Sequence, residues 1–122
     1  MYTMKKECSV REVVNFLGKR WTLLLLLELY KGKSGWKRFS QIKKNLDNIT
    51  SKILSIRLKE LKRENLIEKR ANIEEFPIKS EYRLTKAGKD FIVIIKNIKR
   101  WSLTWKKKNK TCEETDCKNC EF

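Results

Sequence analysis

The chain has 122 residues, of which 40% are hydrophobic, and this is enough for one domain with its own core. Its 30 basic and 15 acidic residues give a net charge of +15, which favours a polyanionic partner, either nucleic acid or an anionic membrane surface. The sequence has no histidine and no clustered glycines, which excludes histidine-based catalysis, histidine metal ligands and a glycine-rich phosphate loop. We therefore expect a binding protein and not an enzyme.

The positive charge is concentrated before the C-terminal segment. Residues 112–122 hold four acidic residues and one lysine, a local charge of −3, so residues 1–111 carry +18. A lysine-rich, thermally adapted composition is an alternative source of the charge, but it usually brings matching glutamate, and here basic residues exceed acidic ones two to one. The longest apolar run, residues 21–30, is too short to span a bilayer, and the N-terminus lacks an apolar signal core. We expect a cytoplasmic protein with reduced cysteines.

The first predicted helix covers residues 9–17, with Ser9 as its cap, Glu12 at the capping-box position and Gly18 at its end. Its apolar stripe consists of Val10, Val13, Val14 and Leu17. A second helix, residues 20–31, is apolar nearly all round and is predicted to be the core helix. The residues expected to be buried in it are Leu23, Leu24, Leu26 and Leu27. The glycine- and lysine-rich segment 31–38 is predicted to be a loop.

The next two segments predict a helix-turn-helix. Residues 39–46 form a short helix capped by Ser40, with Ile42 and Leu46 directed inward, and residues 47–50 form a turn. Thr50 caps a longer helix that runs to about residue 63 or 64. The leucine stripe of this helix consists of Leu54, Leu58 and Leu61. A short helix, a tight turn and a longer amphipathic helix are the elements of a DNA-binding helix-turn-helix.

Two alternating segments, residues 66–71 and 81–85, predict strands around a nine-residue loop that contains the only proline. A helix-turn-helix followed by a hairpin is a winged helix, so the expected fold is mainly α with a small β-hairpin. Thr85 is predicted to cap a last helix that extends to about residue 107. The predicted domain division is a DNA-binding and dimerisation domain, residues 1–107, and an acidic, cysteine-rich tail, residues 108–122, without a core-forming pattern.

The last predicted helix carries a long apolar ridge with helical spacing. Its members are Phe91, Ile94, Ile95, Ile98, Trp101, Ser102 and Trp105. A single small domain cannot cover such a ridge, so we expect it to pair with a second subunit. The alternative is that the ridge folds back on its own core, which we expect for its first two turns.

Three stretches resemble the HxlR-type transcription regulators, a branch of the MarR-like winged-helix proteins. They are CSVREVVNFLGKRWTLLLLLELY, KRFSQIKKNLDNITSKILSIRLKELKRENLIEKR and FPIKSEYRLTKAGK, which lie within residues 8–105. The most specific pieces are Cys8, G-K-x-W-T, R-F-S and Y-x-L-T-x-x-G. The resemblance implies a homodimeric, cytoplasmic, DNA-binding repressor or activator that dimerises through its first and last helices. Two details depart from the family, namely GKRW in place of G-G-K-W and a longer loop that adds Trp36, and the family does not explain the tail.

The helix after Thr50 is predicted to lie in the major groove, with its leucines packed on the domain. Its outward residues are Thr50, Ser51, Lys52, Ser55, Ile56, Arg57, Lys59 and Arg63. Polar and basic side chains there suit phosphates and base edges, and the isoleucine suits thymine methyl groups. The simpler alternatives are a solvated basic surface, a chance exposed isoleucine, and an ion pair between Arg57 and Glu60 or Glu64.

Contacts with the DNA backbone are expected from the wing and from the start of the short helix, and they add salt-dependent affinity with little specificity. The residues are Lys37, Arg38, Lys69, Arg70, Lys79 and Arg83, with Lys79 at the wing tip. The expected dimer interface consists of Val10, Val13, Phe91, Ile94, Ile95, Ile98, Trp101 and Trp105. A dimer places two recognition helices about one helical turn, roughly 34 Å, apart, so the site is predicted to be a pseudo-palindrome.

The four cysteines leave three alternatives open. Cys112, Cys117 and Cys120 are spaced C-x4-C-x2-C, and with Cys8 they supply the ligands of a zinc site or an iron–sulfur cluster. Alternatively, they sense redox state or an electrophile, because Cys8 occupies the place of the N-terminal cysteine that some members of the resembled family use for sensing. The third alternative is that the tail cysteines have no role.

The sequence therefore predicts a sequence-specific, homodimeric winged-helix transcription regulator that binds double-stranded DNA and not a membrane. A redox, electrophile or metal signal through the cysteines is the expected input. The main alternative is a nucleic-acid or chromatin-associated protein that binds without sequence preference through its charge. A third alternative is a structural adaptor whose last helix pairs with another protein.

Overall fold

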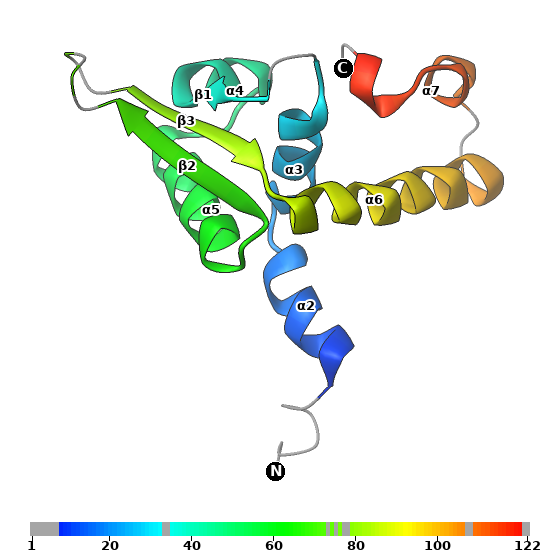
Figure 1. Ribbon diagram of the computed structural model, residues 1–122. Coiled ribbons are helices and arrows are strands. Elements are labelled where there is room, and N and C mark those ends of the chain that lie inside the picture. Colours follow the sequence, from blue (N-terminus) through cyan, green and yellow to red (C-terminus); the bar gives the residue numbers. More distant parts are fainter. Residues whose placement is uncertain are drawn as a thin grey trace.

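The computed structural model of the chain describes residues 8–32, 35–72, 74, 76, 79–106 and 109–120. It is mainly helical, with a small antiparallel sheet beside the helix-turn-helix (Figure 1). The helices are α2 (Ser9–Leu17), α3 (Thr22–Tyr30), α4 (Phe39–Asn45), α5 (Ser51–Arg63), α6 (Lys86–Trp105), α7 (Lys110–Glu114) and the 3-10 helix η1 (Cys117–Asn119). The strands are β1 (Lys37–Arg38), β2 (Ile67–Asn72) and β3 (Lys79–Leu84). Within the described ranges, every helix is too short or too polar to cross a membrane.

The predicted winged helix-turn-helix is confirmed, with α4 and α5 as its helices and β2 and β3 as its wing. The core forms where α3, α4, α5 and α6 pack against one another and against the inner face of the sheet. The leucine stripe of α5 is buried as predicted, with Leu54, Leu58 and Leu61 at most 2% exposed. Burying each such leucine contributes about 1.5–3 kcal/mol relative to leaving it in water. These leucines therefore fix which face of α5 is turned to solvent.

Helix α3 is the core helix, as predicted, but its buried face is shifted. Its core residues are Leu25, Leu26 and Leu29, whereas Leu24 is 53% exposed. Leu23 and Leu27 are half-buried at the margin of the core. A helix that is apolar nearly all round has no polar face to define its rotation, so periodicity alone could not identify the buried residues.

The sheet contains one strand that the sequence did not predict. Its order is β1-β3-β2, and both neighbouring pairs are antiparallel. Strand β1 pairs Lys37 with Tyr82 and Arg38 with Glu81, within the segment predicted to be a loop. Two residues are too few to show an alternating pattern, and the strand depends on pairing with a segment more than forty residues away.

Two of the four predicted helix caps are confirmed. The Thr50 hydroxyl accepts a hydrogen bond from the Ile53 amide at 3.1 Å, and Thr85 does the same for Gly88. The predictions of Ser9 and Ser40 as caps are wrong, because α2 begins at Ser9 itself and α4 begins directly after β1. Neither of those two helices has a side-chain cap.

The Y-x-L-T-x-x-G stretch joins the wing to α6. The Thr85 hydroxyl donates to the carbonyl of Asn65 at 2.6 Å, which ties the start of α6 to the turn after α5. Gly88 packs so closely on this turn that a Cβ atom there would lie 2.1 Å from the Leu66 carbonyl oxygen. Glycine is therefore required at this position, and the motif sets the position of α6 relative to the recognition helix.

The cysteine-rich tail folds back onto the domain even though its sequence has no core-forming pattern. Helix α7 lies beside α6, and η1 packs against α3 (Figure 1). Cys117 is buried there, and the Gly32 amide donates to the Lys118 carbonyl at 2.9 Å. The tail adds a small cover to a core that is already complete, so its sequence shows no periodic signal.

Candidate nucleic-acid interface

Helix α5 presents a polar face to solvent opposite its buried leucines. The exposed residues on this helix include Thr50, Ser51, Lys52, Lys59 and Arg63, and Ser55 is half-buried. Within the described residues, the three cationic side chains have no ion-pair or hydrogen-bond partner. Free amides in the first turn of a helix also attract anions, so this end of α5 suits a phosphate.

Ile56 lies on the same outward surface and is 37% exposed. An apolar side chain among exposed lysines gains nothing in water, but it can pack on a thymine methyl group. Its exposure therefore leaves it available for the predicted base contact, which stays a prediction.

The Arg57 side chain bonds to other parts of the domain and is not part of the outward face of α5. Its Nε donates to the Arg20 carbonyl at 2.9 Å, and its Nη1 donates to Glu60 Oε1 at 2.9 Å. Glu60 also pairs with Lys19. The Lys19 ammonium, together with Arg57, holds the pKa of Glu60 below its ordinary value. This cluster ties α5 to the turn between α2 and α3, which orients the recognition helix.

The prediction that Lys37 contacts the DNA backbone is wrong. Lys37 is 5% exposed, and its ammonium bonds the carbonyl of Glu28 and lies 3.3 Å from Glu28 Oε2. Asn45 Nδ2 donates to the same carboxylate oxygen at 2.8 Å. The register explains the burial, because Lys37 lies opposite Tyr82 on the inner face of the sheet. Glu28 is the one acidic residue of the core helix, and its need for a buried partner is the signal that could have identified this pair.

The outer face of the sheet carries a cluster of cations around one tryptophan. The guanidinium carbons of Arg70 and Arg83 lie 4.3 and 4.4 Å from the centroid of the Trp36 ring. Arg70 also pairs with Glu81 at 2.9 Å, and Arg83 pairs with Glu68. Both arginines remain about half exposed, so they can reach a phosphate only by sharing these partners.

The remaining wing residues are placed as follows. Arg38 and Lys69 are exposed, and the Lys69 ammonium lies 5.8 Å from the centroid of the Tyr82 ring. Lys79 is exposed but is the first residue of β3, paired with Asn72, so it flanks the tip instead of forming it. Of the predicted tip, residues 73, 75, 77 and 78 lie outside the described residues. Phe76 within it is fully exposed and is not among the predicted site residues.

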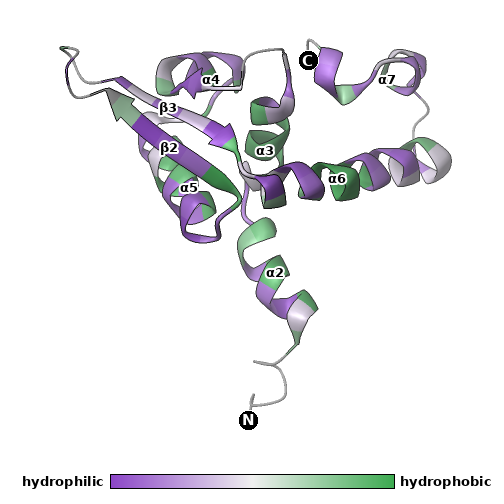
Figure 2. Ribbon diagram, viewed as in Figure 1, coloured by the Kyte–Doolittle hydropathy of each residue, from purple (hydrophilic) through white to green (hydrophobic). Residues whose placement is uncertain are grey.

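The apolar surface predicted for dimerisation lies on two projecting helices, α2 and α6 (Figure 2). The predicted residues that are exposed there are Val10, Val13, Ile94, Ile98, Trp101 and Trp105. Val14 and Val93 are exposed beside them and were not in the predicted set. Two predicted members belong to the chain's own core, because Ile95 is buried and Phe91 packs half-buried against it. Both lie on the face of α6 that turns toward α3.

The four cysteines are free thiols in different surroundings. Cys8 is exposed at the start of α2, Cys112 and Cys120 are half-buried, and Cys117 is buried. The start of α2 and the tail lie on opposite sides of the chain (Figure 1). Among the residues that the structure describes, no group of three or more cysteine or acidic side chains is placed to hold a metal ion. One chain therefore does not bring Cys8 and the tail cysteines together.

Comparison with known proteins gives consistent matches. A family model described as HxlR-like helix-turn-helix matches residues 16–110. An uncharacterized HTH-type transcriptional regulator of Bacillus subtilis, YvaP, is 39% identical over 94 residues, which cover 77% of this chain and 83% of the relative. The matched region includes the helix-turn-helix, the wing and α6, but most of the tail lies beyond the family model.

Solved structures are similar in fold as well as in sequence. A MarR-family transcriptional regulator from Porphyromonas gingivalis is matched with a TM-score of 0.70 and 30% identity, over 80% of this chain and 91% of that one. The reduced form of the transcriptional regulator YodB from B. subtilis gives a TM-score of 0.68 and 31% identity, over 89% and 98% of the two chains. The diamide-treated and quinone-bound forms of YodB also match, with TM-scores of 0.65 and 0.66.

Proposed function

Because the chain belongs to the HxlR-like helix-turn-helix family of transcriptional regulators, we propose that it binds a specific pseudo-palindromic DNA site as a homodimer. The observation that carries the proposal is the outward face of α5. Its leucines are buried, while Lys52, Lys59 and Arg63 are exposed and unpaired among the described residues. This face suits the major groove of duplex DNA.

In the proposed complex, the DNA contact of each outward α5 residue depends on its position along the helix. The free amides and hydroxyls of the first turn, at Thr50 and Ser51, take a phosphate or a base edge. Lys52 and Lys59 reach phosphates or guanine, and Ile56 packs on a thymine methyl group. The exposed cations of the wing lie along the backbone and add affinity that falls with salt.

The proposed dimer uses the exposed apolar surface of α2 and α6. Side chains such as Trp101 and Trp105 are costly to leave in water, and a second copy of the chain covers them with the same surface. Pairing two chains also sets the spacing of the two α5 helices, at about one helical turn or roughly 34 Å. Sedimentation at micromolar concentration should therefore give a dimer, and Trp101→Glu should give a folded monomer.

We also propose that Cys8 is the thiol through which the regulator responds to an oxidant or an electrophile. Its exposure makes it accessible, and it directly precedes α2, one half of the proposed dimer surface. A change at this thiol can therefore alter the spacing of the recognition helices. Diamide would join the Cys8 thiol to a second thiol, such as a tail cysteine of the other chain in the proposed dimer, as a disulfide while it is itself reduced to the hydrazine. This treatment should weaken DNA binding by the wild-type chain but not by Cys8→Ser. Equal sensitivity of the two proteins would contradict this role.

The alternative use of the cysteines is a zinc ion or an iron–sulfur cluster. A site built from all four thiols would need two chains, because Cys8 and the tail lie on opposite sides of one chain (Figure 1). Metal analysis of anaerobically purified protein distinguishes the two uses. Stoichiometric zinc or iron supports the metal site, whereas metal-free protein with a Cys8-dependent response supports sensing.

DNA recognition is tested by fluorescence anisotropy of the reduced protein at physiological salt. The duplex from immediately upstream of its own coding region is compared with a shuffled duplex of equal length. A specific reader should prefer the native duplex by about a thousandfold or more. Equal affinity for the two would favour a charge-driven binder without sequence preference, and no binding at all would favour a protein–protein adaptor.

A further inference from the structure

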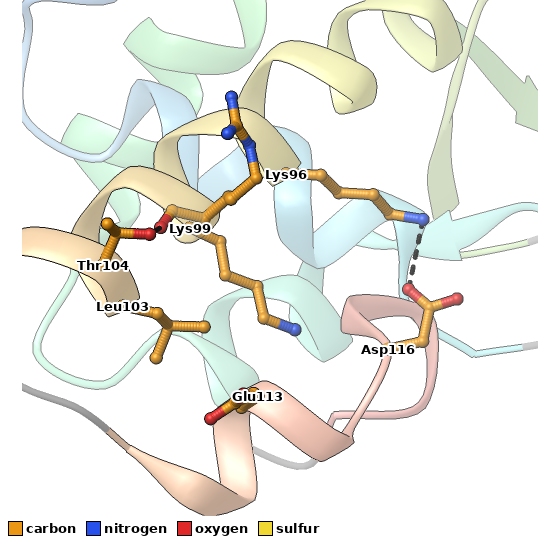
Figure 3. Close-up of a pocket in the computed structure, with 7 residues that line it drawn as sticks. Lys96, Lys99, Leu103, Thr104, Glu113 and Asp116 are labelled. Carbon is orange, nitrogen blue, oxygen red and sulfur yellow. Dashed lines mark hydrogen bonds and ion pairs between the residues drawn. The ribbon is translucent and has the colours of Figure 1, made fainter.

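A cavity of about 540 Å³ lies between α6 and the tail (Figure 3). Its volume is within the range of small-molecule sites, roughly 300–1,000 Å³. The residues that line it are Lys96, Lys99, Arg100, Leu103, Thr104, Glu113 and Asp116. One wall is formed by α6 and the other by the tail, most of which lies beyond the residues that the family model matches. The tail wall of the cavity therefore lies mostly outside the region that the family model matches.

The charges of the described lining are separated between the two walls. All three cations lie on α6, and both carboxylates, Glu113 and Asp116, lie on the tail. Lys96 bonds Asp116 at 3.1 Å and the Tyr30 hydroxyl at 3.1 Å, and this contact holds the tail in place. These partners raise the pKa of Lys96, with Tyr30 as the larger cause, and Lys96 lowers that of Asp116.

The rest of the lining retains capacity for a ligand. The Lys99 ammonium extends from α6 toward the tail (Figure 3) and donates to the Thr115 carbonyl at 2.7 Å, which uses one of its three hydrogens. The side chains of Arg100 and Glu113 have no hydrogen-bond or ion-pair partner among the described residues. Once the Lys96–Asp116 pair is set aside, the lining retains two cations, Lys99 and Arg100, and one carboxylate, Glu113.

We propose that this cavity binds a small amino dicarboxylate, a molecule with two carboxylates and one ammonium group. Its carboxylates pair with Lys99 and Arg100, its ammonium pairs with Glu113, and Leu103 covers the short aliphatic part. A simple dicarboxylate leaves Glu113 unpaired beside negative charge, and a simple amine leaves the two cations unpaired. The proposal concerns binding alone and does not depend on the DNA-binding role.

The position of the cavity also suggests an effect on the dimer, and this part rests on the proposed function. The cavity is lined by one face of α6, while Ile98, Trp101 and Trp105 are exposed on the rest of that helix. A ligand that bridges α6 and the tail therefore biases the orientation of α6 in the proposed dimer interface.

The test is isothermal titration of the full-length, reduced protein with L-glutamate and L-aspartate. Glutarate, which lacks the ammonium group, is the matched control ligand. We expect at least one of the two amino acids to bind, with glutarate weaker by about tenfold or more. Lys99→Met and Glu113→Gln should each weaken binding by a similar factor, whereas Lys86→Met, an exposed lysine of the same helix outside the cavity, should not.

Three results would overturn the proposal. The first is no binding of either amino acid at ligand concentrations up to about 10 mM. The second is equal affinity for glutarate, and the third is unchanged affinity in both cavity variants with circular dichroism spectra like the wild type. None of these readouts involves DNA, so failure here and failure of the proposed DNA recognition are separate results.

Discussion

The outward faces of α5 and of the sheet are both rich in cations, yet the two surfaces are built differently. On α5, Lys52, Lys59 and Arg63 have no partner among the described residues. On the sheet, Arg70 and Arg83 are each paired with a glutamate and stacked on Trp36. An unpaired cation is free to form an ion pair with a phosphate. A cation already paired with a glutamate must either bind both groups at once or exchange the glutamate for the phosphate. The difference indicates that the cations of α5 are available to bind a ligand, whereas those of the sheet first stabilise the sheet itself.

The largest effect is expected from a cation that is paired and fully enclosed. Lys37→Met leaves the Glu28 carboxylate buried with Asn45 as its one remaining side-chain partner among the described residues. Breaking one side of a buried ion pair costs about 3–5 kcal/mol, so the free energy of unfolding in urea should fall by that amount. Lys52→Met, which replaces an exposed lysine of α5, is the control and should have little effect on stability.

The double variant Glu28→Met/Lys37→Met tests the reason for that loss. With both charges removed, the site should recover most of the stability, because no buried carboxylate remains without its cation. Asn45 is exposed enough to find water instead. A single variant that costs less than about 1 kcal/mol would contradict the burial of this pair.

The next largest effect is expected on DNA affinity, and it is tested by replacing one cation from each surface. Lys59→Ala should weaken DNA binding by about tenfold and reduce the slope of log affinity against log salt by about 0.9, the loss of one phosphate contact. Arg70→Ala should weaken binding less, because Arg70 already shares its charge with Glu81. Stability should show the reverse order, with Arg70→Ala the more destabilising. Equal effects of the two variants on affinity would remove the distinction between the surfaces.

A smaller effect separates base recognition from electrostatic attraction on α5 itself. Ile56→Ala leaves the charge unchanged but removes the proposed contact with a thymine methyl group. Affinity for the preferred duplex should fall by about 1 kcal/mol, the cost of one poor base contact, while affinity for a shuffled duplex stays the same. Competition anisotropy measures both affinities. An equal loss of affinity for both duplexes would mean that Ile56 makes no sequence-specific contact.

The smallest effect concerns the cluster that orients α5. Glu60→Gln weakens the contacts with Lys19 and Arg57. The loss in unfolding free energy at pH 7 should be below about 1 kcal/mol, because the Lys19 side chain is 44% exposed and water screens its charge. The pKa of Glu60 is lowered in the folded chain, so its contribution is present above about pH 4.5 and is lost as the pH falls through the lowered value.

Urea unfolding at pH 7 and at low pH tests this dependence on charge. The difference in unfolding free energy between wild type and Glu60→Gln should vanish in acid, where Glu60 is protonated in both the folded and the unfolded chain. Glu64→Gln, an exposed residue at the end of the same helix, should match wild type at both values of pH. A difference that persists unchanged in acid would show that the ionised carboxylate contributes nothing.

The parts of this molecule that the sequence predicted are those set by local pattern. The leucine stripe of α5 and the Thr50 and Thr85 caps follow from helical spacing and from adjacent side chains. They also define the outward face of α5, so most of the candidate site on that helix could be located before the structure was known. The family resemblance is confirmed over the same region.

The parts that the sequence did not predict depend on contacts between distant segments. Lys37 is indistinguishable from its neighbours in a basic loop until β1 pairs with β3 and turns it toward Glu28. The first turns of the ridge are expected from the sequence to fold back on the core, but only the way that α6 crosses α3 determines that Ile95 is buried there while Ile94 stays exposed. The tail docks through single contacts, such as the one between Gly32 and Lys118, which leave no periodic trace.

If two copies of α5 bind DNA together, a hydroxyl-radical footprint on a duplex selected from a random pool should show two protected patches. We expect the patches to be related by two-fold symmetry, with centres about 10–10.5 base pairs apart. A single patch without symmetry, or uniform protection of any duplex, would contradict this expectation.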